Sequence, residues 1–249
     1  MNKMIPVLSL LAVLMATAIF LTQSDDSEAL TDGNWEFTVD SDDNATITKY
    51  TKTSSSTPSI TVPATVTANG VTYPVKTVGA HYEPGASYTS VFVSSKGHFS
   101  LIFSEGIEKI ENYACAGLGE RFDGTLTLPS TLEYIGYSAF SNARFTGSLI
   151  IPDSVTYIGD YAFYNCQSSI TKFKLSSNIT EIRSYAFAGL VNSNCDLIIP
   201  EGVTRIRANA FSGSPFGNNV NDHHCVVLPS TVNSINADAF SLGYGVDTL

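Results

Sequence analysis

A motif with fixed internal spacing recurs six times between Leu101 and Phe240, and it restricts the fold more than any other feature of the chain. Each unit starts with an apolar–x–apolar triplet followed by Pro or Ser, which we number position zero. Position +3 is Ile, Leu or Val, position +6 is always Ile, position +10 is always Ala, and position +11 is Phe except at Cys115. The zero positions are Ser104, Pro129, Pro152, Ser176, Pro200 and Pro229. This self-similarity predicts a stack of equivalent units, a solenoid.

The spacing also predicts what each unit contains. Successive zero positions are 23 to 29 residues apart, and all of the variation falls after position +11, so insertions should loop out on one face. The triplet before position zero alternates as a β-strand does, with two side chains inward and one outward. Proline at position zero cannot donate to a ladder and should end that strand. Positions +3 to +6 predict a second short extended piece, and the Ala-Phe pair predicts a turn of helix.

The residues before the regular units predict a cap and a degenerate first repeat. Trp35–Val39 and Ala45–Tyr50 alternate at period two around an Asp/Asn-rich turn, which indicates a β-hairpin. A worn repeat begins at Ile60–Pro63, is interrupted by the hairpin signal Ala68-Asn69-Gly70, and resumes at Val75. We therefore expect a mainly β protein in which residues 25–58 form a capping region and residues 59–249 form the solenoid. A solenoid needs a cap because its end units otherwise expose their stacking face.

Residues 1–24 form a predicted targeting segment, since Met4–Leu21 is apolar apart from Ser9 and Thr17. The length fits either a cleaved signal peptide or a retained membrane anchor. Both alternatives predict a secreted or cell-surface protein that contacts the membrane only through this segment, if it is retained. The formal net charge of −10 argues against nucleic acid as a partner.

No enzymatic motif or metal-ligand pattern stands out, so we expect no catalytic, cofactor-binding or metal-binding residues. Cys115 and Cys166 are expected to be buried small hydrophobic residues. Cys195 and Cys225 begin successive strands, and a disulfide between them stays open at this point. Asn44 and Asn178 each begin an Asn-x-Thr sequon, which predicts glycosylation only in a host that performs it.

The units resemble a known family at this level of detail. Leu149–Pro152 followed by Ile158–Phe163, and Leu197–Pro200 followed by Ala210-Phe211, are similar to the BspA-like (Treponema-type) leucine-rich repeats. The resemblance is strong from Leu101 onward and weak before it. It implies a curved leucine-rich-repeat solenoid on a secreted or surface protein, often one that takes part in adhesion.

Equal offsets in neighbouring units stack into rows, and three outward rows supply the candidate binding residues. The −2 row includes Ile150, Lys174 and Ile198. This row is either an exposed face for a protein partner, or its apolar residues only reflect the residue preferences of β-strands. The +5 row places Tyr134 beside Tyr157, as either a binding contact or a cross-strand aromatic pair. Arg183 and Arg207 are neighbours in the +7 row, and Glu181, near Arg205 and Arg207, is expected to neutralise this pair of like charges by ion pairing.

These features favour an extracytoplasmic binding module that recognises a protein or glycoprotein. The alternative is a structural subunit of a membrane- or envelope-associated complex. A hydrolase is disfavoured because no nucleophile or acid/base set occurs. The end near Phe240 is expected to self-associate or to pack on another chain, because an uncovered ladder invites pairing.

Overall fold

The computed structural model describes residues 29–52, 59–79, 89–93, 95, 98–166, 169–190, 195–214 and 225–241. The predicted targeting segment lies outside these ranges. Every regular element in them is a β-strand, which confirms the mainly β solenoid. Within the same ranges, no helix has the length and apolarity that crossing a membrane requires.

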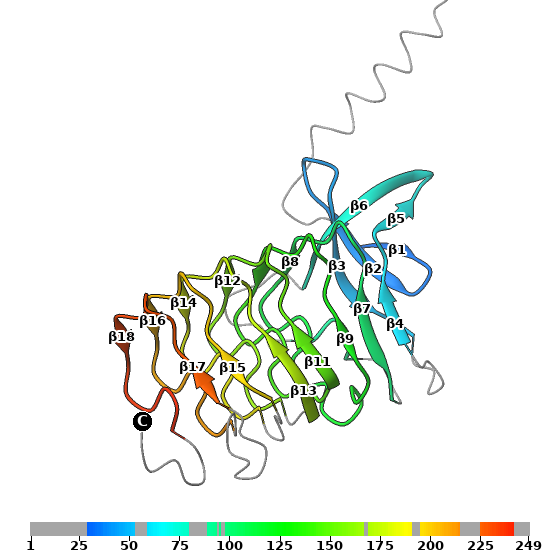
Figure 1. Cartoon of the computed structure of the whole chain (residues 1–249). Coiled ribbons are helices and arrows are strands. Elements are labelled where there is room, and N and C mark those ends of the chain that lie inside the picture. Colours follow the sequence, from blue (N-terminus) through cyan, green and yellow to red (C-terminus); the bar gives the residue numbers. More distant parts are fainter. Residues whose placement is uncertain are drawn as a thin grey trace, which may run out of the picture.

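The N-terminal end consists of an antiparallel three-stranded meander, which is the cap, and a hairpin that belongs to the degenerate first repeat. Strands β1 (Leu30–Asp32), β2 (Trp35–Val39) and β3 (Ala45–Tyr50) pair antiparallel, and β2 and β3 are the two strands predicted from the sequence. Strand β4 (Ser59–Val62) is followed by the hairpin of β5 (Thr65–Ala68) and β6 (Val71–Val78), which turns at Asn69-Gly70. Both turn residues have positive φ, as a two-residue hairpin of type I′ requires. Figure 1 shows these hairpins at one end of the solenoid.

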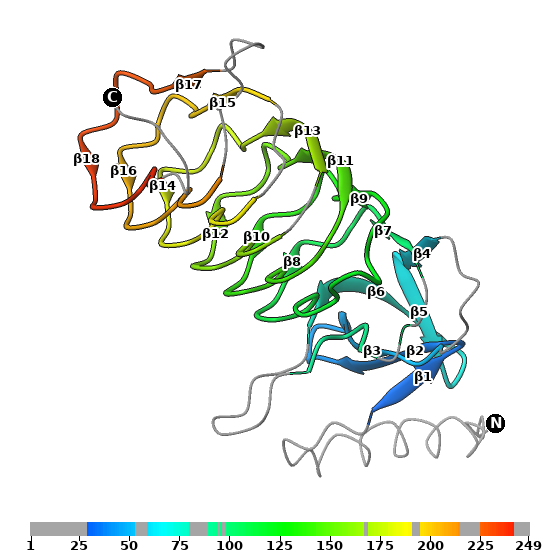
Figure 2. The same ribbon diagram turned by 90° about the horizontal axis from the view of Figure 1, so that it is seen from below.

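Each coil of the solenoid contributes two short strands. The strands that precede position zero are β7 (Ser100–Phe103), β9 (Leu126–Thr127), β11 (Thr146–Ile150), β13 (Ser169–Lys174), β15 (Leu197–Ile198) and β17 (Val226–Val227). The strands at positions +5 and +6 are β8 (Lys109–Ile110), β10 (Tyr134–Ile135), β12 (Tyr157–Ile158), β14 (Glu181–Ile182), β16 (Arg205–Ile206) and β18 (Ser234–Ile235). The two sets lie on opposite sides of the stack (Figure 2).

Strands of one set pair in parallel from coil to coil. One sheet has the order β1-β2-β3-β6-β8-β10-β12, so the cap continues directly into the solenoid. The other sheets are β4-β7-β9, β11-β13, β15-β17 and β14-β16-β18. Val78 pairs with Ile110 and β4 pairs with β7, which confirms the degenerate first repeat.

The core is a column of repeated side chains between the two sets of strands. The +6 isoleucines of the first five regular coils are 0–4% exposed, and the +10 alanines are buried in all six. The +11 phenylalanines stack from coil to coil, with ring centroids 5.1–5.5 Å apart along Phe140, Phe163, Phe187, Phe211 and Phe240. Cys115, in the same position, and Cys166 are fully buried as predicted, and burial raises the pKa of both thiols. Cys195 and Cys225 are free thiols.

The predicted turn of helix at Ala-Phe is wrong. Position +9 has positive φ in every coil, at Tyr113, Ser138, Tyr161, Tyr185, Asn209 and Asp238. A left-handed residue ends a right-handed helix, and the N–H groups of positions +10 and +12 close two tight turns around it instead. The N–H of position +11 donates to the +10 carbonyl of the next coil, for example from Phe163 to Ala186 at 2.8 Å. Alternate N–H groups thus link the coils, which a helix would not allow.

Serine replaces proline at two zero positions because its hydroxyl ties one coil to the preceding one. Ser104 Oγ donates to the carbonyl of Val62, and Ser176 Oγ donates to that of Val155, each at 2.6 Å. Ser176 is fully buried, so this hydrogen bond satisfies a polar atom that would otherwise be costly inside the solenoid.

Candidate binding surface

The predicted binding residues divide between the two sides of the solenoid. Tyr134, Tyr157 and Arg205 lie on β10, β12 and β16, and Arg183 and Arg207 directly follow β14 and β16. We call this set, together with Glu181, the tyrosine–arginine strip. Ile150, Lys174 and Ile198 lie on β11, β13 and β15, on the opposite side (Figure 2). A partner with a flat binding surface can therefore contact the tyrosine–arginine strip or the −2 row, but not both.

Tyr134, Tyr157 and Arg183 form a continuous stack across three coils. The rings of Tyr134 and Tyr157 are parallel within 7°, with centroids 4.8 Å apart. The guanidinium carbon of Arg183 lies 4.6 Å from the centroid of the Tyr157 ring. Because Tyr134 belongs to the preceding coil and Arg183 to the following one, Tyr157 is held between them. The pKa of Tyr134 is raised, mainly by burial and next by the neighbouring Tyr157 and Glu111.

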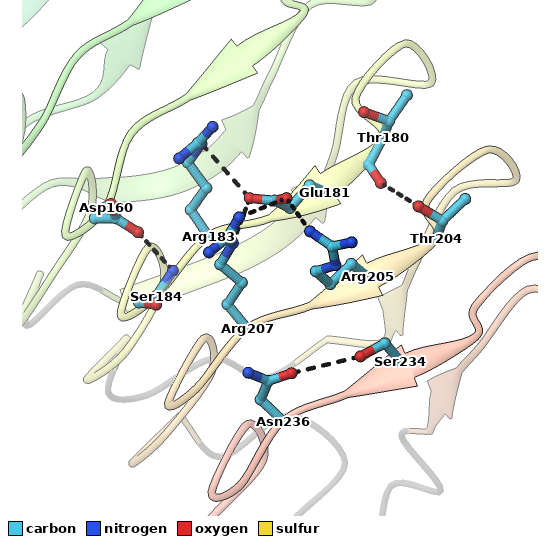
Figure 3. A network of polar contacts seen from close by, with 10 residues as sticks. All are labelled: Asp160, Thr180, Glu181, Arg183, Ser184, Thr204, Arg205, Arg207, Ser234 and Asn236. Atoms are coloured by element: carbon cyan, nitrogen blue, oxygen red, sulfur yellow. Dashed lines mark hydrogen bonds and ion pairs between the residues drawn. The ribbon is translucent and has the colours of Figure 1, made fainter.

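Glu181 lies at the centre of three arginines (Figure 3). Its two carboxylate oxygens accept hydrogen bonds from Nε and Nη2 of Arg207, at 2.5 and 3.0 Å. Arg205 Nη1 lies 3.5 Å from one oxygen and Arg183 Nε lies 3.8 Å from the other. The hydrogen bond from Arg207 is the main reason that the pKa of Glu181 is lowered. The expected ion pairing is present, and it leaves one negative charge among three positive ones.

The arginines mark a break in the sheet. Strands β12 and β14 belong to separate sheets, although β10–β12 and β14–β16 pair in parallel. The N–H of Gly159 donates to Ile135 at 2.8 Å, and that of Arg207 donates to Ile182 at 2.9 Å. No corresponding bond from Arg183 occurs among the described residues. Its side chain, on Tyr157, spans the place where the ladder is interrupted.

The opposite side is partly apolar. Ile198 is 60% exposed and lies beside Val227, which is 44% exposed. Ile150 is half-buried and pairs with Lys174, whose ammonium forms an ion pair with Asp153 at 2.7 Å. The outward orientation predicted for the −2 row is thus clearest at Ile198 and Val227, at the β17 end of the row.

A second aromatic row was not predicted from the sequence. Tyr137, Tyr161 and Tyr185 form a ladder on successive coils, with centroids 5.6 and 4.7 Å apart. Tyr113 extends it at 5.3 Å from Tyr137, and Tyr164 packs against Tyr161 at 5.4 Å. Tyrosine at position +8 or +9 in four successive units was the available signal. We call these five residues the tyrosine ladder.

The two sequon asparagines and the side chains that could ligate a metal ion lie in ordinary surroundings within the described part of the chain. Asn178 is exposed, and its Nδ2 donates to the carbonyl of Asp153 at 2.6 Å, whereas Asn44 is half-buried beside β3. Within the part of the chain that the structure describes, no three His, Cys, Asp or Glu side chains could hold a metal ion together.

The comparisons with known proteins agree with the repeat. A family model described as BspA type Leucine rich repeat region matches six copies over residues 88–218, more than half of the chain. A leucine-rich repeat protein from Bacteroides ovatus ATCC 8483 superposes with a TM-score of 0.58 at 18% identity, over 87% of this chain and 56% of that chain. This chain therefore spans little more than half of that protein, and the likeness shows the fold alone.

Two further solved structures align over most of this chain with low TM-scores. A leucine rich cell surface protein from Faecalibacterium prausnitzii A2-165 gives 0.30 at 19% identity, over 90% of this chain and all of that one. The pneumococcal vaccine antigen PcpA gives 0.36 at 16% identity, over 87% and 69%. No curated protein matches the chain.

Proposed function

Because the chain belongs to the BspA-type leucine-rich repeat family, we propose that it is a non-catalytic, extracytoplasmic binding module that attaches to a protein or glycoprotein. The observation that carries the proposal is the tyrosine–arginine strip, where half-buried aromatic and arginine side chains and the exposed Arg205 converge on one side of the solenoid. Tyr and Arg are the residue types most enriched at the energetic centres of interfaces. The apolar start of the chain supports an extracytoplasmic location.

The strip is built to present side chains in fixed positions. Its strands hold one residue of each coil beside its equivalent in the next coil, as in Tyr134 opposite Tyr157 and Glu181 opposite Arg205. A partner that binds there meets groups whose rotamers are already restricted by stacking and ion pairing. Such pre-organisation lowers the entropy that binding must overcome.

Adhesion to a coat of mixed extracellular-matrix glycoproteins tests this proposal. We expect Tyr134→Ser with Tyr157→Ser to weaken attachment by about tenfold or more, since aromatic anchors in interfaces contribute at this level. The circular dichroism spectrum should remain that of the parent. The matched control is Tyr73→Ser with Tyr113→Ser, which removes two tyrosines outside the strip. If both double variants fold and attach as strongly as the parent, the strip is not the binding surface.

A structural subunit is the second candidate function, and the open edge of the last described coil favours it. Val226, Leu228 and Ile235 are 38–44% exposed, although most of their equivalents in inner coils are buried. Such a subunit would be recovered with other envelope proteins after mild cross-linking. A free binder would be released alone into the medium.

A further inference from the structure

We infer that Arg183 and Arg205, on either side of Glu181, form an anion-binding site that takes the sulfate or carboxylate group of an acidic saccharide. The inference rests on the proposed function, because it names the chemistry of the partner that the tyrosine–arginine strip recognises. It draws on the charge balance of the site, its unused hydrogen-bond donors, and the side chains that surround it.

The charge at this place is opposite to that of the whole chain. The formal net charge is −10, yet three of the five arginines lie around one carboxylate. Glu181 offsets one of the three positive charges, and Asp160 also acts electrostatically on Arg207, so the positive excess is centred on Arg183 and Arg205. The remaining excess is local, and charges of the opposite sign further than about 8–10 Å away are largely screened at physiological salt. An anion therefore finds a favourable potential here, although the protein as a whole repels it.

The hydrogen-bond donors of the cluster are only partly used. Arg207 occupies both oxygens of Glu181 with a bidentate pair at 2.5 and 3.0 Å. Arg205 reaches the same carboxylate with one long bond of 3.5 Å, and the guanidinium of Arg183 donates no hydrogen bond within the described residues. A guanidinium has five N–H donors, so most donors of Arg183 and Arg205 remain available. The Arg205 side chain is 53% exposed and that of Arg183 is 30% exposed, so a ligand can reach both.

The position of Arg183 is fixed before a ligand arrives. Its guanidinium lies over the Tyr157 ring, which is itself stacked on Tyr134. A planar guanidinium held against an aromatic face keeps its N–H edge free for an oxyanion. The sheet break between β12 and β14 places Arg183 between the two ladders.

The surroundings favour a saccharide over an acidic peptide. Most bound peptides are anchored by apolar side chains in hydrophobic grooves or by pairing with an open strand edge, and an acidic motif can also be held by an arginine cluster through its charges. Among the described residues, the exposed large aliphatic side chains are at Val71, Val93, Ile198, Val226, Val227, Leu228 and Ile235, all outside the strip. Arg183 is followed in sequence by the hydroxyl-bearing Ser184 and Tyr185, and its guanidinium lies over the ring of Tyr157, another hydroxyl-bearing side chain. Hydroxyl groups and guanidinium groups suit the hydroxyls and anionic groups of an acidic sugar chain.

Binding of the full chain to immobilised polysaccharides tests the inference. We expect binding to heparin, which carries sulfate, or to hyaluronan, which carries only carboxylate, and no binding to uncharged dextran. The preferred polymer identifies the anionic group. Arg183→Gln with Arg205→Gln should weaken the affinity by about tenfold or more, because each charge-assisted hydrogen bond contributes at least that order. Glu181→Gln should strengthen it, because the competing carboxylate is neutralised.

A charge-matched control separates the site from the net charge. Arg144→Gln with Lys49→Gln removes two positive charges elsewhere and should leave heparin and hyaluronan binding within about twofold, since distant surface charges are screened. Equal losses in the two double variants would overturn the inference, as would binding of poly-glutamate as tight as that of both polysaccharides. If Arg183→Gln with Arg205→Gln keeps matrix attachment and polysaccharide binding unchanged, the saccharide site is wrong while the proposed function stands.

Discussion

Phe187 occupies the middle of the phenylalanine column and has no exposed surface. Its ring is stacked between Phe163 and Phe211 at 5.4 and 5.5 Å, and Phe173 meets it edge-on at 5.4 Å. We expect Phe187→Ala to lower the free energy of unfolding by about 3–5 kcal/mol, because a buried aromatic leaves a cavity between two coils. Urea denaturation followed by circular dichroism measures the loss.

The matched control for this column is Phe240→Ala. Phe240 is only partly buried, and among the described residues its ring stacks only on Phe211. Phe240→Ala should lower the free energy of unfolding by less than half as much as Phe187→Ala does. A melting temperature of Phe187→Ala within a degree of that of the parent would contradict the assignment of this residue to the core.

Asp153 links two coils through an exposed carboxylate. It accepts hydrogen bonds from Lys174 Nζ at 2.7 Å and from the N–H of Ser177 at 2.9 Å. The hydrogen bond from Lys174 is the main reason that the pKa of Asp153 falls from 3.8 to about 2. A lowered pKa in the folded state means that the carboxylate stabilises the fold above pH 3.8, and that this contribution disappears as the pH falls through about 2.

We therefore expect Asp153→Asn to melt at a lower temperature than the parent at pH 6. The difference should shrink between pH 4 and 2, and differential scanning calorimetry across that range measures it. Asp123→Asn, which removes the partner of an exposed histidine, serves as the control. A difference that stays constant down to pH 2 would show that Asp153 contributes through shape rather than charge.

At the scale of elements, the break between β12 and β14 has a measurable consequence. Equivalent N–H groups at Gly136, Gly159, Arg207 and Asn236 donate to the preceding coil at 2.8–2.9 Å, and that of Arg183 does not. An amide without an acceptor exchanges with solvent through smaller openings. We expect the Arg183 amide to exchange at least about tenfold faster than that of Gly159 in NMR-detected hydrogen exchange. Equal protection of the two amides would mean that the sheet continues through β14.

The offsets of the repeat predicted most of these elements from the sequence. Constant Ile, Ala and Phe positions identify the core, because each must face inward in every coil. The turn after Ile158 was misjudged, since nothing in Tyr161-Ala162-Phe163 by itself indicates a left-handed tyrosine. That conformation is favoured by hydrogen bonds to the next coil, a tertiary effect that local propensity does not contain.

The candidate surface was predicted in part. Stacking of equal offsets correctly placed Tyr134 beside Tyr157 and Glu181 among the arginines. The contact of Arg183 with Tyr157 joins positions +7 and +5 of different coils, so a row-by-row comparison could not find it. The tyrosine ladder was missed for a similar reason, because it mixes position +8 at Tyr137 with position +9 at Tyr161.

At the scale of the whole molecule, the two ends of the solenoid differ. The N-terminal end is covered by the cap, since β3 pairs with β6 and β6 pairs with β8 in one sheet. In the last described coil, the +6 isoleucine, Ile235, is 44% exposed, whereas Ile206 in the coil before it is fully buried. The cap thus covers the end of the first coil, whereas no described segment covers the end of the last described coil.

The last described coil also presents backbone N–H groups of the kind that inner coils use to bond to the following coil. In inner coils the N–H groups of the strand before position zero donate forward, as Leu197 does to Cys225 and Ile199 to Val227, each at 3.0 Å. By the same pattern the N–H groups of Val226 and Leu228 point away from β15, and no described residue accepts from them. A parallel strand edge with exposed apolar side chains is a template for pairing with another chain.

We expect this end to associate with a second copy or another chain, and sedimentation of the full chain at micromolar concentration measures self-association. Val226→Lys with Ile235→Lys should shift any dimer to monomer, because two ammonium groups on the stacking face repel each other and resist burial. Ile198→Lys is the control, since Ile198 has the most exposed large apolar side chain in the described part of the chain but lies on the outer face of β15. A strict monomer in which Val226 to Leu228 exchange as slowly as Leu149 to Ile151 would contradict the expectation, because the edge would then already be protected within one chain.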